Sequence, residues 1–211
     1  MNCNCPAPAA LTEIPTSECA FDLKQIQRLA FVIAGKVTWG QTGSIPVADA
    51  DITALADWQA RSTAVNDTKI VYSPLIGGDP AITAGEAVTT GGGDNSTLNG
   101  VTEVTGVNPS GFTATFKSIT PEQELALKQF MCRPDIEVYL FVEGGKIVSE
   151  EIAGTPTGRK GLRIQSYFFS DRNNAGFGAK DTFTMTFQFP AGWSEKLVMD
   201  TPADFNPLYD L

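Results

Sequence analysis

The chain has 211 residues, with 15 Lys plus Arg against 24 Asp plus Glu, which gives a net charge of −9. With 42% hydrophobic and 18% charged residues, its composition is that of a folded globular domain and excludes wholesale disorder. The negative charge opposes sequence-independent nucleic-acid binding, because that depends on basic residues that neutralise phosphates. Histidine is absent, which excludes Ser-His-Asp and Cys-His catalysis and zinc sites with imidazole ligands. The composition therefore favours a binding or structural role.

No membrane segment or leader is expected. The longest apolar run, Leu29 to Ala34, has six residues, whereas a membrane helix needs roughly 18. The N-terminal stretch Met1 to Pro8 has neither the basic nor the apolar region of a secretory signal. The default compartment that we expect is therefore the bacterial or host cytoplasm, in which thiols are reduced.

The four cysteines do not have the spacing of a metal site. They are Cys3, Cys5, Cys19 and Cys132. A structural zinc site uses closely spaced pairs, but here the first pair is Cys-x-Cys and Cys132 lies 113 residues beyond Cys19. The simpler interpretation is two exposed thiols on an N-terminal arm and two small buried hydrophobes, with a metal or a disulfide as the alternative.

The chain divides into three regions. Residues 1–20 are rich in Pro and Ala and predict an extended arm, because proline blocks regular structure. Residues 21–190 predict a single β-rich domain, since no linker or internal repeat interrupts them. Residues 191–211 predict an extended C-terminal tail with Trp193, Phe205 and Tyr209 as its anchors.

Two helices are expected in the domain, one that ends at Arg61 and one that begins at Thr120. A short helix or turn over Asp22 to Gln27 leads into a strand from Arg28 to Ala34. Asp49 or Asp51 then caps a helix that runs to Arg61. The apolar stripe predicted for this helix consists of Ile52, Leu55, Ala56 and Gln59, with Trp58 beside it.

The region from Thr68 to Ser118 combines strands with a long loop. Thr68 to Ser73 alternates and is β-branched, so it predicts a strand. Gly77 to Gly100 is a long Gly/Thr-rich segment whose centre, residues 91–97, predicts a mobile loop or the tip of a long hairpin. Strands are expected over Gly100 to Thr105 and Gly111 to Ser118. In the second of these, Phe112, Ala114 and Phe116 share one face. Between them Asn108-Pro109-Ser110-Gly111 predicts a turn.

The second helix begins with a complete start signal. Thr120 occupies the cap, Pro121 the first helical position, and Gln123 the capping-box position. The helix is expected to run to Cys132. Its predicted core-facing residues are Leu127, Phe130 and Met131.

The remaining strands follow from clear alternation. Ile136 to Glu143 and Lys146 to Glu150 predict a hairpin across Gly144-Gly145. Arg163 to Ser170 and Asp181 to Phe189 predict two further strands. In the last of these, one face is apolar and consists of Phe183, Met185, Phe187 and Phe189.

None of the candidate chemical motifs is complete. Gly91-Gly92-Gly93 lacks the Gly-Lys-Ser/Thr that a phosphate-binding loop requires. Glu150 and Glu151 are adjacent, so in a strand they point to opposite faces. Asp79 and Asp94 do not belong to a spaced calcium-binding loop. We therefore assign no catalytic, cofactor-binding or metal-binding residue, and we expect no cofactor and no enzyme activity.

Small basic clusters occur within this acidic chain. They are Lys24, Arg28 and Lys36 near the start, and Arg159, Lys160 and Arg163 further on. Ion pairs between subunits explain them as well as a bound ligand does.

Four blocks of the sequence carry a resemblance. They are CPAPAALTEIP with CAFDLKQIQRLAFVIAG, DITALADWQARSTAVNDTKIVYSPLI, GGGDNSTLNGVTEVTGVNPSGFTATF and FPAGWSEKLVMDTPADFNPL. In this order they are similar to virion proteins of tailed phages and prophages of Bacteroidales bacteria. Together they cover well over half of the chain, and none is a catalytic signature.

The resemblance implies a tail-tube-like protein. Such a protein has a β-sandwich or rolled antiparallel sheet with one or two flanking helices. It assembles with its own copies into a hexameric ring and works with other tail proteins. Its long loop contacts the next ring, and phage DNA passes through an acidic lumen without specific binding. The implied location is the virion tail.

Two alternatives remain open. One is another virion component, namely a tail terminator, a head decoration or a baseplate protein. The other is a β-sandwich that binds a host surface or a carbohydrate. Exposed aromatic residues favour the second alternative, but Trp39, Trp58 and Trp193 are spread along the sequence rather than paired.

Overall fold

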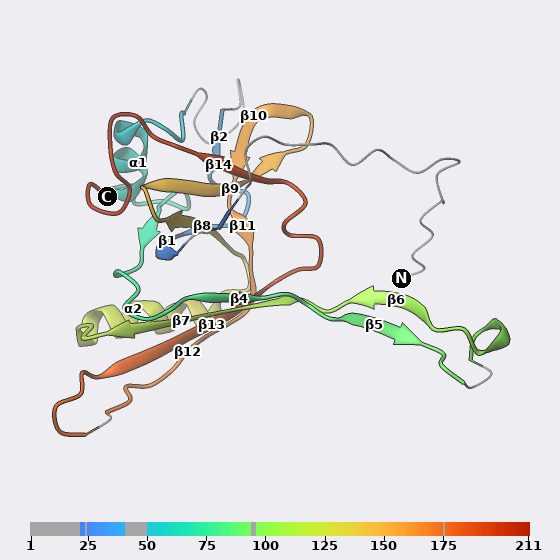
Figure 1. Cartoon of the computed structure of the whole chain (residues 1–211). Helices are drawn as coiled ribbons and strands as arrows, with labels where there is room; N and C mark the ends of the chain where they lie inside the picture. Colours follow the sequence, from blue (N-terminus) through green and yellow to red (C-terminus); the bar gives the residue numbers. More distant parts are fainter. Residues whose placement is uncertain (1–21, 24, 41–49, 94–95, 175) are drawn as a thin grey trace.

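The structure is a computed structural model that describes residues 22–23, 25–40, 50–93, 96–174 and 176–211. Within these residues, fourteen strands form three antiparallel sheets, accompanied by the helices α1 (Leu55–Ser62) and α2 (Pro121–Gln129) (Figure 1). Two short 3₁₀ turns are η1 (Leu98–Gly100) and η2 (Phe130–Cys132). The predicted β-rich α+β class is confirmed. Neither described helix is long enough or apolar enough to cross a bilayer.

The larger sheet has eight strands, all paired antiparallel. They are β1 (Ile26–Ile33), β2 (Thr38–Trp39), β3 (Val71–Tyr72), β8 (Ile136–Val142), β9 (Lys146–Ile152), β10 (Thr155–Lys160), β11 (Leu162–Arg163) and β14 (Leu197–Asp200). The main order is β2-β10-β9-β8-β1-β3, while β11 pairs with β8 and β14 pairs with β9. The predicted hairpin is confirmed, because Phe141 pairs with Ile147 across the Gly144-Gly145 turn.

The smaller sheet has four strands in the order β12-β13-β7-β4. They are β4 (Ala81–Thr83), β7 (Ser110–Lys117), β12 (Gln165–Phe169) and β13 (Thr182–Phe189). β7 and β13 pair along their whole length, from Ser110–Phe189 to Lys117–Thr182. The third sheet contains only β5 (Ala87–Thr90) and β6 (Glu103–Val107).

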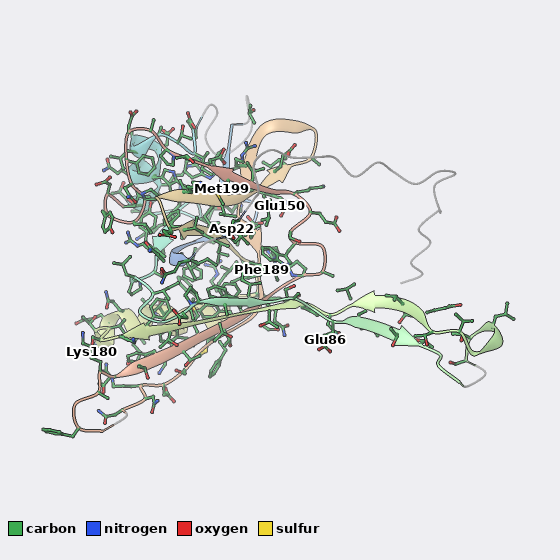
Figure 2. The ribbon with its side chains drawn as sticks, in the orientation of Figure 1. Asp22, Glu86, Glu150, Lys180, Phe189 and Met199 are labelled. Atoms are coloured by element: carbon green, nitrogen blue, oxygen red, sulfur yellow. The ribbon has the colours of Figure 1, made fainter. Side chains whose placement is uncertain are left out.

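The main core lies between the two larger sheets. The apolar face predicted for β13 is buried there, and it meets the inward face of β7, which also was predicted correctly. Phe112 stacks on Phe187 with ring centroids 4.4 Å apart. The opposing layer comes from β1 and β8 and includes Leu29, Phe31 and Leu140. Figure 2 shows Phe189 among the side chains between the layers.

A second core lies on the other face of the larger sheet. Because β8 is buried at every residue, it contributes to both cores, with Tyr139 and Phe141 on this side. α1 covers the face with Trp58, and the C-terminal segment adds Phe205 and Leu208. Tyr209, expected as an anchor, is instead 75% exposed.

Several boundaries differ from expectation. β1 begins at Ile26, inside the segment expected to be a short helix or turn, and the described residues just before it, 22–23 and 25, are not helical. α1 begins after Ala54 without a side-chain cap; Asp49 lies outside the described residues, and Asp51 accepts bonds from Thr53 in the preceding turn instead. The predicted stripe is correct only in part: Ile52 is buried and Leu55 packs against the second core, but Ala56 and Gln59 are exposed. The buried residues of α1 itself are Trp58 and Arg61.

The C-terminal part of the second predicted helix also differs. Its start is confirmed, since Thr120 accepts from the Gln123 amide and the Gln123 side chain accepts from the Thr120 amide. After Gln129 the helix tightens into a 3₁₀ turn, which has three residues per turn instead of 3.6. This change of phase leaves Met131 43% exposed, although it was predicted to face the core.

The strand expected from Arg163 to Ser170 is divided between two sheets. β11 pairs with β8 in the larger sheet, whereas β12 pairs with β13 in the smaller one. Ile164, at the change, is buried in the main core. The chain thus forms a corner of the two-layer structure, which is a common way for strands to pass between packed sheets.

Candidate functional site: a projecting hairpin arm

A two-stranded arm leaves the body of the protein. We define the arm as β5, β6 and the described residues around them, 85–93 and 96–109. Figure 1 shows the arm extending to one side, away from both packed layers. Val88 lies opposite Gly106, and Thr90 lies opposite Glu103. The arm is therefore the outer part of a long hairpin whose inner part is the β4–β7 pair.

Bonds at the base connect the inner and outer parts of this hairpin. The Asn108 amide donates to the Glu86 carbonyl at 2.9 Å, and the Gly85 amide donates to Ser110 Oγ at 3.2 Å. A Cβ on Gly85 would lie 1.7 Å from the Asn108 carbonyl oxygen, so only glycine permits this close approach. At the tip, Gly91 has a φ of 97°, a conformation that favours glycine.

The turn predicted over Asn108 to Gly111 is wrong. β6 and β7 follow one another in sequence but do not pair; β6 pairs with β5, and β7 pairs with β4 and β13. Asn108 and Pro109 instead form the bend where the hairpin leaves the body. Of the two alternatives for residues 91–97, the long hairpin is the one that the structure has, although Asp94 and Asn95 lie outside the described residues.

The arm buries very little of its own apolar surface. All four residues of β5 are exposed, as are four of the five residues of β6. Its large exposed aliphatic residues are Val88, Leu98, Val101, Val104 and Val107. In Figure 2 the side chains of the arm stand free, beyond Glu86 near its base. The arm thus presents an elongated apolar surface and two strand edges to its surroundings.

The arm is also acidic. The sequence contains no Lys or Arg between Lys69 and Lys117, whereas Glu86 and Glu103 lie on the described part of the arm. A surface that combines aliphatic and acidic residues in this way fits a partner with an apolar groove and a basic rim.

The chemical motifs considered from the sequence do not come together. Glu150 forms an ion pair with Lys160 at 3.0 Å, while the Glu151 amide donates to the Lys196 carbonyl just before β14. Asp79 is exposed near β4. Among the described residues, no cluster of three or more His, Cys, Asp or Glu side chains forms a metal site.

The basic clusters have partners within the chain. Lys36 pairs with Asp67 at 2.8 Å, and Arg159 pairs with Asp200 at 2.9 Å. Arg163 donates to the Pro134 carbonyl at 2.8 Å. Lys24 lies outside the described residues. Lys36, Arg159 and Lys160 therefore form ion pairs inside the chain, while pairs between subunits stay a prediction.

The tryptophans do not form a sugar-binding surface. Trp39 and Trp58, distant in sequence, pack together with ring centroids 4.5 Å apart, so the expectation of unpaired tryptophans is wrong. Both are buried in the second core, with exposed fractions of 1% and 0%. Trp193 stacks on Phe189 at 4.4 Å. Their faces are therefore occupied by the protein itself.

Cys132 is exposed, although it was predicted to be buried. It is the last residue of the same 3₁₀ turn that contains Met131. The other three cysteines lie outside the described residues, so the predictions about them stay predictions.

Two buried charged residues were missed in the sequence. Arg61 lies over the Trp39 ring at 4.1 Å and donates from Nη2 to the Thr38 carbonyl at 3.0 Å; burial lowers its pKa. Glu137 is 7% exposed, and burial raises its pKa. A charged residue inside the otherwise apolar run of β8 was the available signal for Glu137.

Comparisons with known proteins give only distant likenesses. No protein-family model matches the chain, and no curated protein matches it. A chain from the virion of the native gene transfer agent particle is 9% identical, covers 63% of this chain and 89% of its own length, and has a TM-score of 0.34. A chain from the tail of the empty particle of that agent, with C6 symmetry, is 10% identical over 60% of this chain and 81% of its own, with a TM-score of 0.31.

A third solved structure comes from a baseplate. A chain from the 6-fold symmetrised baseplate of the anti-feeding prophage is 12% identical, covers 88% of this chain and 98% of its own length, and has a TM-score of 0.33. The chain therefore has a weak structural similarity to parts of phage-like tails and baseplates.

Proposed function

We propose that this protein is a structural subunit of a phage-type virion tail and that it assembles with its own copies through the arm. The observation that carries the proposal is the exposed arm. A two-stranded hairpin alone is at best marginally stable in water, and this one leaves five aliphatic side chains exposed. Docking on a neighbouring subunit would bury these side chains and pair the free strand edges.

The tail-tube assignment is the finer part of the proposal. The four sequence blocks that resemble phage virion proteins support a tail component, and an arm that reaches from one ring to the next suits a tube. A net charge of −9 fits a lumen through which DNA passes without binding. We further propose a hexameric ring, assembly with other tail proteins and a location in the virion tail. The proposal includes no catalytic step.

The test is the assembly state of the full chain as its concentration rises. Sedimentation velocity and negative-stain electron microscopy are expected to reveal rings or tubes. Val104→Asp with Val107→Asp should abolish long assemblies, because two charges replace apolar contacts on the arm. Tyr209→Asp is the matched control, since Tyr209 is exposed and lies outside the arm; it should assemble like the unaltered protein.

A different outcome would favour the surface-binding alternative. If the unaltered protein stays monomeric at high concentration and also in the presence of other proteins of the same virion, the tail proposal is wrong. Specific binding on a glycan array would then identify a carbohydrate-binding protein instead.

A further inference from the structure

An apolar groove lies between β3 and the corner formed by α2 and η2. Two neighbouring cavities, of about 210 Å³ and about 170 Å³, share Val71 and Phe130, so they form one continuous depression. We call it the β3–α2 groove. Besides these two residues, the first cavity is lined by Phe31, Val32, Ile33, Asn66, Lys69, Arg133 and Ile136, and the second by Arg28, Tyr72, Ser73, Pro74, Gln123, Ala126 and Leu127.

One wall of the groove contains an incompletely paired strand edge. The ladder between β1 and β3 covers only Ala30 and Phe31 on β1, so Val32 and Ile33 have no partner on β3. Before β3 the Ile70 amide donates to the Arg61 carbonyl rather than to β1. On β1 itself the Ile33 carbonyl already accepts from the Lys36 amide at 3.1 Å, so the open part of this edge is short. The groove therefore offers both an apolar floor and a short stretch of strand edge, which are the two features that an added strand uses.

The groove is basic in an acidic protein. Its lining includes Arg28, Lys69 and Arg133, and no Asp or Glu. Arg28 donates to the Ser73 and Leu211 carbonyls, and Arg133 forms an ion pair with Asp135 at 3.1 Å. Exposed Lys69 has no carboxylate within 4.0 Å among the residues that the structure describes, so it is the rim charge that is open to a partner. Since the whole chain carries a charge of −9, two copies repel each other except where such a patch meets an acidic segment.

The arm has the complementary chemistry but lies at the opposite end of the molecule. Figure 1 places α2 at one side of the body and the tip of the arm far away on the other, so the arm does not reach the groove of its own chain. A contact from the arm of one copy to the groove of the next joins two different surfaces. Such a contact repeats from subunit to subunit, and it closes a ring or builds an open array.

We propose that the β3–α2 groove is the receptor for the arm of a second copy of this chain. This inference rests on the proposed function, because it names the surface on which the arm docks. The valines of the arm enter the apolar floor, Glu86 and Glu103 face the basic rim, and one strand of the arm extends the edge of β1 beyond Phe31.

The experiment uses one variant on each side of the contact. Lys69→Glu reverses the charge of the groove at an exposed position, and Val104→Asp alters the arm. Each variant alone should need at least about tenfold more protein to form long assemblies, because every contact then lacks one intact surface. Lys196→Glu reverses an exposed lysine outside the groove and should assemble normally. Circular dichroism and thermal melting confirm that each variant folds.

Mixing the two variants gives the decisive readout. A Val104→Asp copy keeps an intact groove, and a Lys69→Glu copy keeps an intact arm, so an equimolar mixture can form single contacts but not continuous ones. Sedimentation should show particles of twice the mass of either variant's own assembly, with nothing longer. If Lys69→Glu assembles as readily as Lys196→Glu while the unaltered chain forms arrays, the groove is not the receptor and the tail proposal stands. If the unaltered chain does not assemble at all, both fail together.

Discussion

Single residues differ widely in their effect on the stability of this protein, and Glu137 is a residue whose burial is unfavourable. Its side chain is buried, and its Oε2 has no hydrogen-bond partner. The Gly35 amide, Lys160 and Arg163 favour its ionised form, whereas Glu150 and above all burial oppose it, so its pKa rises above the ordinary value of 4.5. The fold therefore binds the proton of Glu137 more tightly than the unfolded chain does.

We expect Glu137→Gln to stabilise the protein at neutral pH. The glutamine keeps a carbonyl oxygen for the Gly35 amide but carries no charge, so it avoids the cost of burying a carboxylate. The melting temperature should rise by a few degrees at pH 7, given roughly 2–4 °C per kcal/mol for a domain of this size. The advantage should shrink as the pH falls through the raised pKa and vanish below the ordinary one, where Glu137 is protonated in both states. A variant that is less stable at pH 7 would contradict this assignment.

At the favourable end, Phe187 is a packing residue of the main core. It is 1% exposed, stacks on Phe112 and contacts Phe189 edge-on with centroids 5.2 Å apart. Phe187→Ala should lower the free energy of unfolding by about 3–5 kcal/mol, because it removes apolar contacts and leaves a cavity. Urea titration of this variant beside Thr186→Ala, on the other face of β13, provides the measurement. Equal losses for the two would mean that the strand faces are reversed.

At the scale of elements, α2 begins with a complete capping box. Thr120 and Gln123 satisfy each other's backbone amides, and Pro121 occupies the first turn. Thr120→Ala should reduce the free energy of unfolding by about 1 kcal/mol, because one amide at the helix start loses its partner. Chemical denaturation should show a clear shift of the midpoint for this variant. The control Thr102→Ala should show almost none, because Thr102 is an exposed residue of the arm outside its helices and strands. No shift for Thr120→Ala would indicate that water replaces the cap at little cost.

At the scale of the whole molecule, the C-terminal segment joins distant parts of the fold. β14 pairs with β9, from Leu197–Glu150 to Asp200–Ile147, and the residues beyond it add Phe205 and Leu208 to the second core. The larger sheet thus has a neighbour on each face: the smaller sheet on one side, and α1 with the C-terminal segment on the other.

Deleting residues 197–211 should destabilise the protein by at least about 3 kcal/mol. Burial of one large apolar side chain is worth about 1.5–3 kcal/mol, and the deletion removes two of them as well as a strand. The second core would be uncovered, so binding of a hydrophobic dye should increase. Tyr209→Ala alters only an exposed side chain and should melt like the unaltered protein. An unchanged melting temperature after the deletion would show that the segment contributes no stability.

The sequence alone determined those features that depend on neighbouring residues. Alternation at every second position placed the faces of β7 and β13 correctly, and the Gly144-Gly145 pair specified the β8–β9 hairpin. The Thr120 capping box likewise fixed where α2 begins. Each of these signals acts over a few residues, through side-chain period, backbone conformation or local hydrogen bonds, so the rest of the chain does not alter it.

Only the tertiary structure decided which strands pair and which faces become buried. Asn108 and Pro109 do form a bend, but they do not join two paired strands. β6 pairs with β5 because the hairpin continues outward from the β4–β7 pair. Trp58 and Arg61 point inward because β2 and β8 supply Trp39 and Tyr139 on the facing side. Such choices depend on contacts between residues far apart in sequence, and the exposed arm with the groove at the opposite end exists only once those contacts are made.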